Sequence, residues 1–103
     1  MSSTDAVGIA KRFVSLVNTK VPVTQAYLFG SYAKNLAKDY SDIDVCIVSP
    51  RYGKDYWDEE SDLRKLSLKV DDRLEPVAFN PKDIKDRWNQ LAHEITTYGI
   101  QIN

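Results

Sequence analysis

Two aspartates, Asp42 and Asp44, stand two positions apart at the start of an apolar segment that ends at Val48. Side chains along a strand alternate between its two faces, so both carboxylates would point one way and Ile43 the other. With a rise of about 3.3 Å per residue, their Cα atoms would be roughly 6.5 Å apart, and such carboxylates can share metal ions about 3.5–4 Å apart. Carboxylate oxygens are the ligands that Mg²⁺ prefers. The pair predicts a magnesium site; the alternative is that Asp42 caps a turn and Asp44 faces solvent.

Gly30-Ser31 directly follows an apolar run, Gln25–Phe29, that is typical of a strand. Glycine lets a backbone approach a ligand closely, and consecutive N–H groups at the start of a helical turn bind anions. The Ser31 hydroxyl can add a hydrogen bond to a phosphate oxygen. On its own, a Gly-Ser pair is better interpreted as an ordinary strand-to-helix turn with Ser31 as an N-cap. Next to the aspartate pair of the following strand, it predicts the geometry that a metal–triphosphate requires.

The segments that must position these residues alternate between helical and extended patterns. An amphipathic stripe predicts a first helix that Asp5 caps, and Pro76 places the third long strand at a sheet edge or at a bulge. The expected order is helix 5–18, strand 25–29, a helical turn within 31–41, strand 43–48, helix 56–70, strand 73–79, a last helix that begins at Asn80-Pro81 and carries Ile84, Trp88, Leu91 and Ile95 on one face, and strand 100–102. This order describes an α/β or α+β fold with a small mixed sheet, in a single domain over residues 1–103.

Composition narrows the class of function. The net charge is -1 and no Lys/Arg-rich run is present, which argues against an extended nucleic-acid interface but not against a metal-neutralised triphosphate. Cys46 is the one cysteine, so no internal disulfide can form, and a cytoplasmic location is expected. No signal-peptide pattern is visible, and no stretch approaches the roughly 20 apolar residues of a membrane span.

Five further residues are expected to serve the structure rather than the chemistry. We expect Cys46 in the core and His93 on the surface, because His93 falls off the apolar stripe of its helix. Without a histidine near Cys46, neither a zinc site nor a thiol nucleophile is supported. Ser41 should brace the entrance to the second strand. Trp57 and Trp88 are expected to be packing residues rather than platforms for base stacking.

The stretch 28–45, with Gly30-Ser31 followed by Asp42-Ile43-Asp44, resembles the minimal nucleotidyltransferases (MNT, or MntA-like) of the DNA polymerase β superfamily. Their signature is a glycine-serine turn followed by Asp-x-Asp on the next strand. Weaker similarity continues through residues 74–77 and 91–100, so it covers most of the chain. The resemblance implies the polymerase β-like nucleotidyltransferase fold, with the helices packed on one face of the sheet.

The resemblance also implies a third carboxylate on a later strand. Glu75 is the expected residue; Asp71 and Asp72 are alternatives that look like turn residues, and Glu75 itself could be a solvated edge-strand residue. Asn35 stands where the family often has a left-handed glycine, a conformation that asparagine tolerates. Lys34 either contacts the nucleotide or is simply solvated. The implied set is Asp42, Asp44 and Glu75 as catalytic and metal-binding residues, and Gly30, Ser31 and Lys34 as nucleotide-binding residues.

The activity that the resemblance implies uses two Mg²⁺ ions and transfers a nucleoside monophosphate, AMP from ATP, to a hydroxyl. Similar minimal proteins act beside a HEPN-type helical partner protein, as the antitoxin of a toxin–antitoxin pair, so the acceptor is expected on such a partner. One alternative is a non-catalytic module that binds nucleotide and partner. Another is a small-molecule (antibiotic) nucleotidyltransferase that acts with a helical subunit.

Overall fold

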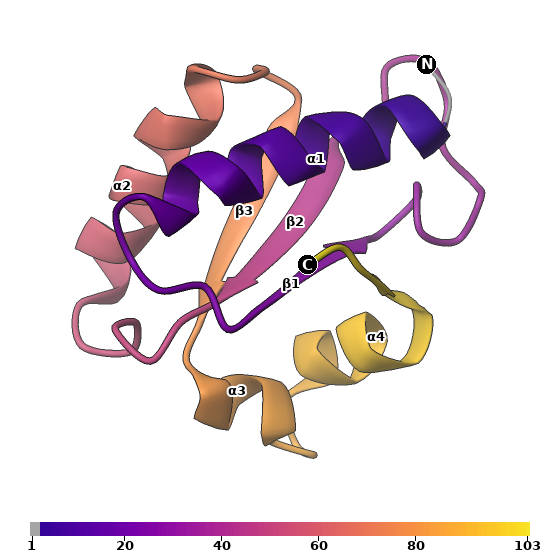
Figure 1. The fold of residues 1–103 in the computed structure, drawn as a ribbon. Helices are drawn as coiled ribbons and strands as arrows, with labels where there is room; N and C mark the ends of the chain where they lie inside the picture. Colours follow the sequence, from indigo (N-terminus) through magenta and orange to yellow (C-terminus); the bar gives the residue numbers. More distant parts are fainter. Residues whose placement is uncertain (1–2) are drawn as a thin grey trace.

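The computed structural model describes residues 3–103, which form helices on both sides of a four-stranded sheet (Figure 1). The strand predictions at Gln25–Phe29 and Ile43–Val48 are confirmed at both ends. The elements in chain order are α1 Ser3–Asn18, β1 Gln25–Phe29, β2 Ile43–Val48, α2 Tyr56–Leu68, β3 Leu74–Phe79, α3 Pro81–Lys85, α4 Gln90–Tyr98 and β4 Ile100–Gln101.

The sheet has the order β3-β2-β1-β4 and is mixed, as predicted. β1 runs antiparallel to both β2 and β4, whereas β2 and β3 are parallel and are joined through α2. The fold class is therefore the expected one. Because β1 is antiparallel to β2, the C-terminal end of β1 lies beside the N-terminal ends of β2 and β3.

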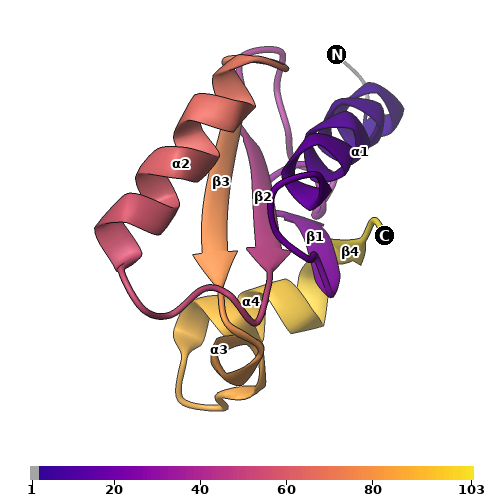
Figure 2. The same ribbon diagram turned by 60° about the vertical axis from the view of Figure 1, so that its left-hand side comes forward.

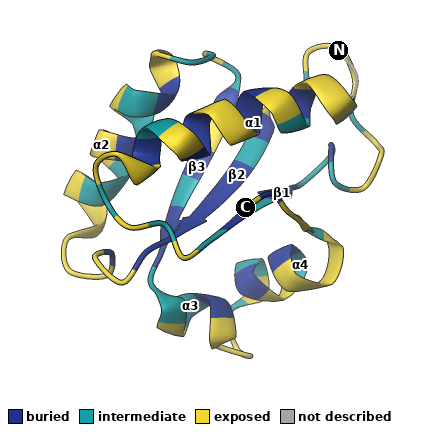
Figure 3. Ribbon diagram, in the orientation of Figure 1, coloured by how far each residue is buried: buried dark blue, intermediate teal, exposed yellow. Residues whose placement is uncertain are grey.

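The helices do not all lie on one face of the sheet, so that part of the expectation is wrong. α1 and α2 pack on the face that carries Ile43, Val45 and Ile47, and α3 and α4 pack on the face that carries Cys46 and Val48. The physical reason lies in β2, which is apolar on both faces; such a strand must be covered from both sides. Figure 3 shows β2 buried along most of its length between the two groups of helices.

Side chains of α2 cover the outer edge of β3, along which the helix runs (Figure 2). Ile43 N donates to Arg73 O on the inner side, so by alternation Pro76 faces outward, where its missing N–H costs no ladder bond. Arg64 donates to Leu74 O at 2.6 Å, and Glu60 accepts from Ala78 N at 2.8 Å. The edge position predicted for Pro76 is confirmed, and the edge is protected against pairing with another strand.

The last helix is interrupted, contrary to prediction. Asn80 caps α3 as expected, but Asp86 then accepts from Trp88 N at 2.9 Å and Asn89 accepts from Ala92 N at 3.0 Å to begin α4. Short polar side chains that bond the local backbone compete with helix continuation. Trp88 therefore lies in the connection and is 80% exposed, whereas Ile95 is fully buried.

Smaller differences concern element ends and single side chains. α1 begins at Ser3, so Asp5 lies in its first turn rather than at the N-cap. Trp57 is 80% exposed and, like Trp88, does not pack in the core of residues 3–103. Cys46 is buried and His93 exposed, as predicted. Within the described residues, no helix has the length and apolar character needed to cross a membrane.

The interruption of the last helix predicts that two truncations of apolar side chains differ strongly in their effect on the free energy of unfolding. Ile95→Ala should lower the free energy of unfolding by about 2–5 kcal/mol, because it leaves a cavity in the core between sheet and α4. Trp88→Ala should change it by less than about 0.5 kcal/mol. Urea denaturation of both variants measures this; a large loss for Trp88→Ala would instead support a continuous, packed helix.

Candidate active site

The carboxylates predicted to act together lie at one end of the sheet. Phe29, Asp44 and Glu75 form one row across β1, β2 and β3, paired position by position. Neighbouring strands are about 4.8 Å apart, so Asp44 and Glu75 start from adjacent positions on the same face. Asp42 lies just before β2 and is exposed. Ile43 points into the opposite core, as alternation predicted.

Gly30 is the point of closest approach between the turn and the aspartate pair. It has φ +72°, and a Cβ built on it would overlap the Asp44 carboxylate and lie 3.1 Å from Asp44 Cγ. Only glycine combines that backbone conformation with that lack of space. The structure therefore places the Asp44 carboxylate directly against the glycine of the Gly30-Ser31 turn.

The connection after β1 contains a hydrogen-bonded turn, in the segment where the sequence predicted a helical turn. Lys34 N donates to Gly30 O at 3.2 Å, and Leu36 N donates to Ser31 O at 2.8 Å. Asn35 has φ +61°, which confirms the left-handed conformation expected there. Ser41 accepts from Lys38 N at 2.8 Å, so it braces the turn.

The turn leaves ligand-binding groups available. Gly30 and Ser31 are each only partly buried. Within residues 3–103 the Ser31 hydroxyl has no hydrogen-bond partner, so it remains free to donate to a phosphate oxygen.

Negative charge accumulates at Asp44. Burial and then, in decreasing order, the nearby carboxylates of Asp42, Glu75 and Glu94 together raise its pKa to about 6. A half-buried carboxylate among like charges is stabilised by a cation, and hard oxygen donors suit Mg²⁺. The donor set thus fits a divalent ion.

The three carboxylates do not form a ready metal-binding cluster. In the described part of the chain, no three acidic, histidine or cysteine side chains are already grouped as a metal cluster. Glu75 Oε1 lies 3.6 Å from Arg64 Nη1, and the Glu75 side chain is 48% exposed. Glu75 would have to turn from Arg64 toward Asp44 to share an ion with it.

Lys34 is held by α4. Its ammonium lies 2.5 Å from Glu94 Oε1 and 5.0 Å from the centre of the Tyr98 ring. Glu94 is thus a fourth acid at this end of the sheet that sequence reasoning missed. No local pattern indicates this role, because the packing of α4 against the turn brings Glu94 to Lys34.

The glycine requirement generates a prediction. Gly30→Ala should lower the free energy of unfolding by about 1–3 kcal/mol, because φ is left-handed and the new methyl group displaces the Asp44 carboxylate. Asn35→Gly is the matched control, since glycine also accepts a left-handed φ and should leave stability unchanged or slightly raised. Urea denaturation compares the two; an unaffected Gly30→Ala would contradict the close approach.

The raised pKa of Asp44 generates a second prediction. The folded protein binds more protons than the unfolded chain between about pH 4 and 6. The contribution of the Asp44 carboxyl to the free energy of unfolding is therefore fully present below about pH 4 and is lost as the pH rises through about 6. Asp44→Asn, which cannot ionise, should be more stable than wild type by about 1 kcal/mol at pH 7 in EDTA, after allowance for solvent screening. The difference should vanish at about pH 4; parallel stability–pH curves for both proteins would contradict it.

Comparison with known proteins agrees with this geometry. The model of the nucleotidyltransferase domain family matches residues 10–98. A nucleotidyltransferase structure from Sulfolobus solfataricus superposes with a TM-score of 0.73 at 20% identity, over 96% of this chain and 80% of that one. A toxin–antitoxin complex with AMP-PNP gives 0.60 at 20% identity, over 90% and 72%.

A third similar structure is the toxin–antitoxin pair MntA-HpeT, in a variant with two Asp-to-Glu changes two positions apart. It gives a TM-score of 0.59 at 20% identity, over 91% of this chain and 71% of that one. None of the curated proteins compared with the chain matches it. The family match spans most of the sequence and both motifs, and the chain belongs to the nucleotidyltransferase domain family.

Proposed function

We propose that this nucleotidyltransferase transfers a nucleoside monophosphate, AMP from ATP, to a hydroxyl of a HEPN-type helical partner protein in the cytoplasm. In this role it acts as the antitoxin of a toxin–antitoxin pair. The observation that carries the proposal is the Asp44 carboxylate lying against Gly30, with Glu75 on the adjacent strand. A metal-binding pair and an anion-binding turn thereby share one surface.

In this proposal the acids bind metal and the Gly30-Ser31 turn binds phosphate. Asp42, Asp44 and Glu75 would hold two Mg²⁺ ions, which when bound supply charge neutralisation and lower the pKa of the acceptor hydroxyl. The backbone N–H groups at Gly30-Ser31, with the free Ser31 hydroxyl, bind the outer phosphates.

The bonds that change follow from this placement. The acceptor oxygen forms its bond to the α-phosphorus in line as the bond to pyrophosphate breaks. Glu75 accepts the hydroxyl proton as general base. Lys34 would leave Glu94 for a phosphate, since both are anionic partners within reach of one flexible side chain.

The acceptor must come from outside the chain. Asp42 and Glu75 are exposed at the sheet end, so a partner's hydroxyl can approach them directly. The similar structures named for toxin–antitoxin pairs, one of them with AMP-PNP, support a toxin partner and an adenine nucleotide. In one of them, two aspartates with the spacing of Asp42 and Asp44 are replaced by glutamate.

A non-catalytic module is favoured by one observation. Glu75 is paired with Arg64, and in residues 3–103 the acids form no ready metal cluster, so the chain could bind nucleotide and partner without reaction. Intact mass after incubation with Mg-ATP and a HEPN-type partner protein distinguishes the two. A mass gain of one nucleoside monophosphate supports the enzyme, whereas a complex without any gain supports the module.

Substitution of the acids tests the assignment. Loss of a residue that only supports a metal ligand lowers metal affinity or activity by roughly 10–100-fold. Asp44→Asn, Asp42→Asn and Glu75→Gln each remove a proposed direct ligand, so each should lower the transfer rate by more than about 100-fold. Asp72→Asn is the matched control, because Asp72 is exposed and precedes β3. The rate of label transfer from α-labelled ATP to the partner measures this. Full activity in Glu75→Gln with loss in Asp72→Asn would assign the third carboxylate to Asp72.

A further inference from the structure

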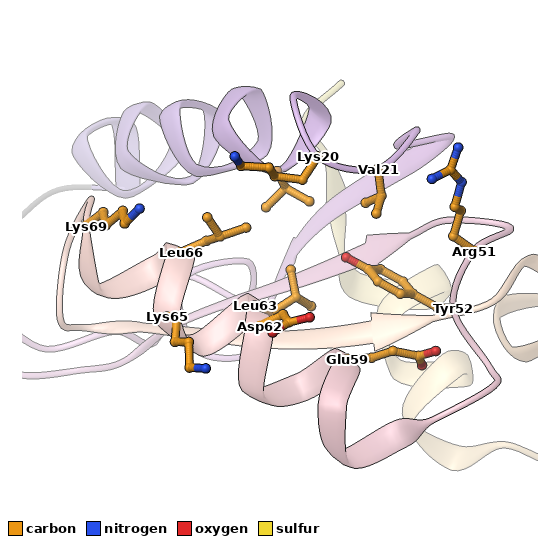
Figure 4. A pocket seen from close by; sticks show the side chains of 11 residues that line it. Lys20, Val21, Arg51, Tyr52, Glu59, Asp62, Leu63, Lys65, Leu66 and Lys69 are labelled. Atoms are coloured by element: carbon orange, nitrogen blue, oxygen red, sulfur yellow. The ribbon is translucent and has the colours of Figure 1, made fainter.

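A cavity of about 540 Å³ lies between the end of α1, the loop after β2 and the side of α2 that faces α1 (Figure 4). It is separate from the carboxylate site. Its lining residues Val17 and Leu63 belong to the core on the α1–α2 face, whereas Asp44 and Cys46 lie on the other face of β2. Moreover, Tyr52 follows the C-terminal end of β2, and Asp44 stands near its beginning.

The floor of the cavity is apolar and contains one unused polar group. Val21, Leu63 and Leu66 line it, together with the ring of Tyr52. Tyr52 is 7% exposed, and its hydroxyl is directed toward Val21 and Leu63 in Figure 4. Within residues 3–103 this hydroxyl has no hydrogen-bond partner. Burial, with the nearby carboxylates of Glu59, Glu60 and Asp62, raises the pKa of Tyr52 to about 12, so the hydroxyl stays protonated and can donate a hydrogen bond to a ligand.

The rim of the cavity carries an excess of positive charge. Lys20 extends from the end of α1 and Lys69 from the end of α2, both beside Leu66 in Figure 4, and Arg51 and Lys65 complete the cations of the lining. No ion pair joins any of these four cations to a carboxylate of residues 3–103.

The two acids of the lining do not balance these cations. Glu59 accepts three backbone N–H bonds, from Gly53, Lys54 and Asp55, at 2.9–3.2 Å, so its carboxylate is committed to the loop. With Asp62, the lining has two carboxylates against four cations. A ligand that fits must therefore be apolar in its body and negative at one end.

We propose that this cavity binds a small amphipathic organic acid, with an aromatic or branched-alkyl body and a single anionic group. The body would cover Leu63 and Leu66, the anion would lie between Lys20 and Lys69, and the Tyr52 hydroxyl would donate to a polar atom of the body. The volume lies within the roughly 300–1,000 Å³ typical of small-molecule sites. This site is independent of the proposed nucleotidyl transfer.

The test uses anilinonaphthalene sulfonate, which has an aromatic body and one anionic group, titrated into the folded chain at pH 7. We expect saturable binding at one site, weakened about tenfold in the double variant Lys20→Met and Lys69→Met and weakened by salt. Lys11→Met with Lys38→Met is the matched control of equal charge change outside the cavity and should bind as wild type. Because all four lysines are exposed, the variants should fold.

A second readout locates the probe. Backbone amide shifts on binding should cluster at Tyr52, Leu63 and Leu66 and spare Gly30 and Asp44. Absence of saturable binding, equal affinity in the double variant, or shifts centred on Gly30 would overturn the proposal. If the probe does not bind but the double variant weakens a complex with the partner protein, the cavity is a protein-docking surface instead.

Discussion

The contact between the Asp44 carboxylate and Gly30 is the constraint on which the site depends. A side chain at position 30 would occupy the space of that carboxylate, and the backbone there is left-handed. The antiparallel pairing of Phe29 with Asp44 and the parallel pairing of Asp44 with Glu75 bring the turn and both acids to one row. The turn, the acids and the sheet register thus depend on one another, and a slip of β2 by one residue would separate all three.

β2 supplies the rigidity for this arrangement. It pairs on both sides and is buried on both faces, by α1 and α2 on one and by α3 and α4 on the other. Asp44, near the start of β2 and beside the Gly30-Ser31 turn, is the one residue of this strand that is partly exposed to solvent. That position explains both its raised pKa and its capacity to bind a cation, because desolvation and like charges disfavour the unpaired carboxylate.

Much of this could be predicted from residue patterns. The strands around the two motifs and the edge position of Pro76 follow from strong local preferences for extended or non-donating backbone. The left-handed Asn35 was expected from the family resemblance, and asparagine tolerates that conformation. The side of the sheet on which each helix packs could not, because it depends on contacts distant in sequence. Trp88 was misplaced because Asp86 and Asn89 bond the local backbone in a segment whose apolar spacing is helical. Glu94 and the Tyr52 cavity were missed because only the tertiary fold brings them to Lys34 and to α2.

The acids at the sheet end lie beside the Gly30-Ser31 turn, where a bound cation and a bound triphosphate would each lower the cost of the other's charge. The most direct measurement is anomalous scattering from crystals grown with Mn²⁺ and a nonhydrolysable ATP analogue. The account predicts Mn²⁺ bound by Asp42, Asp44 and Glu75, with Glu75 turned from Arg64, and the outer phosphates on the backbone at Gly30-Ser31. Phosphates bound elsewhere, or Mn²⁺ absent from these three carboxylates while nucleotide is present, would contradict it.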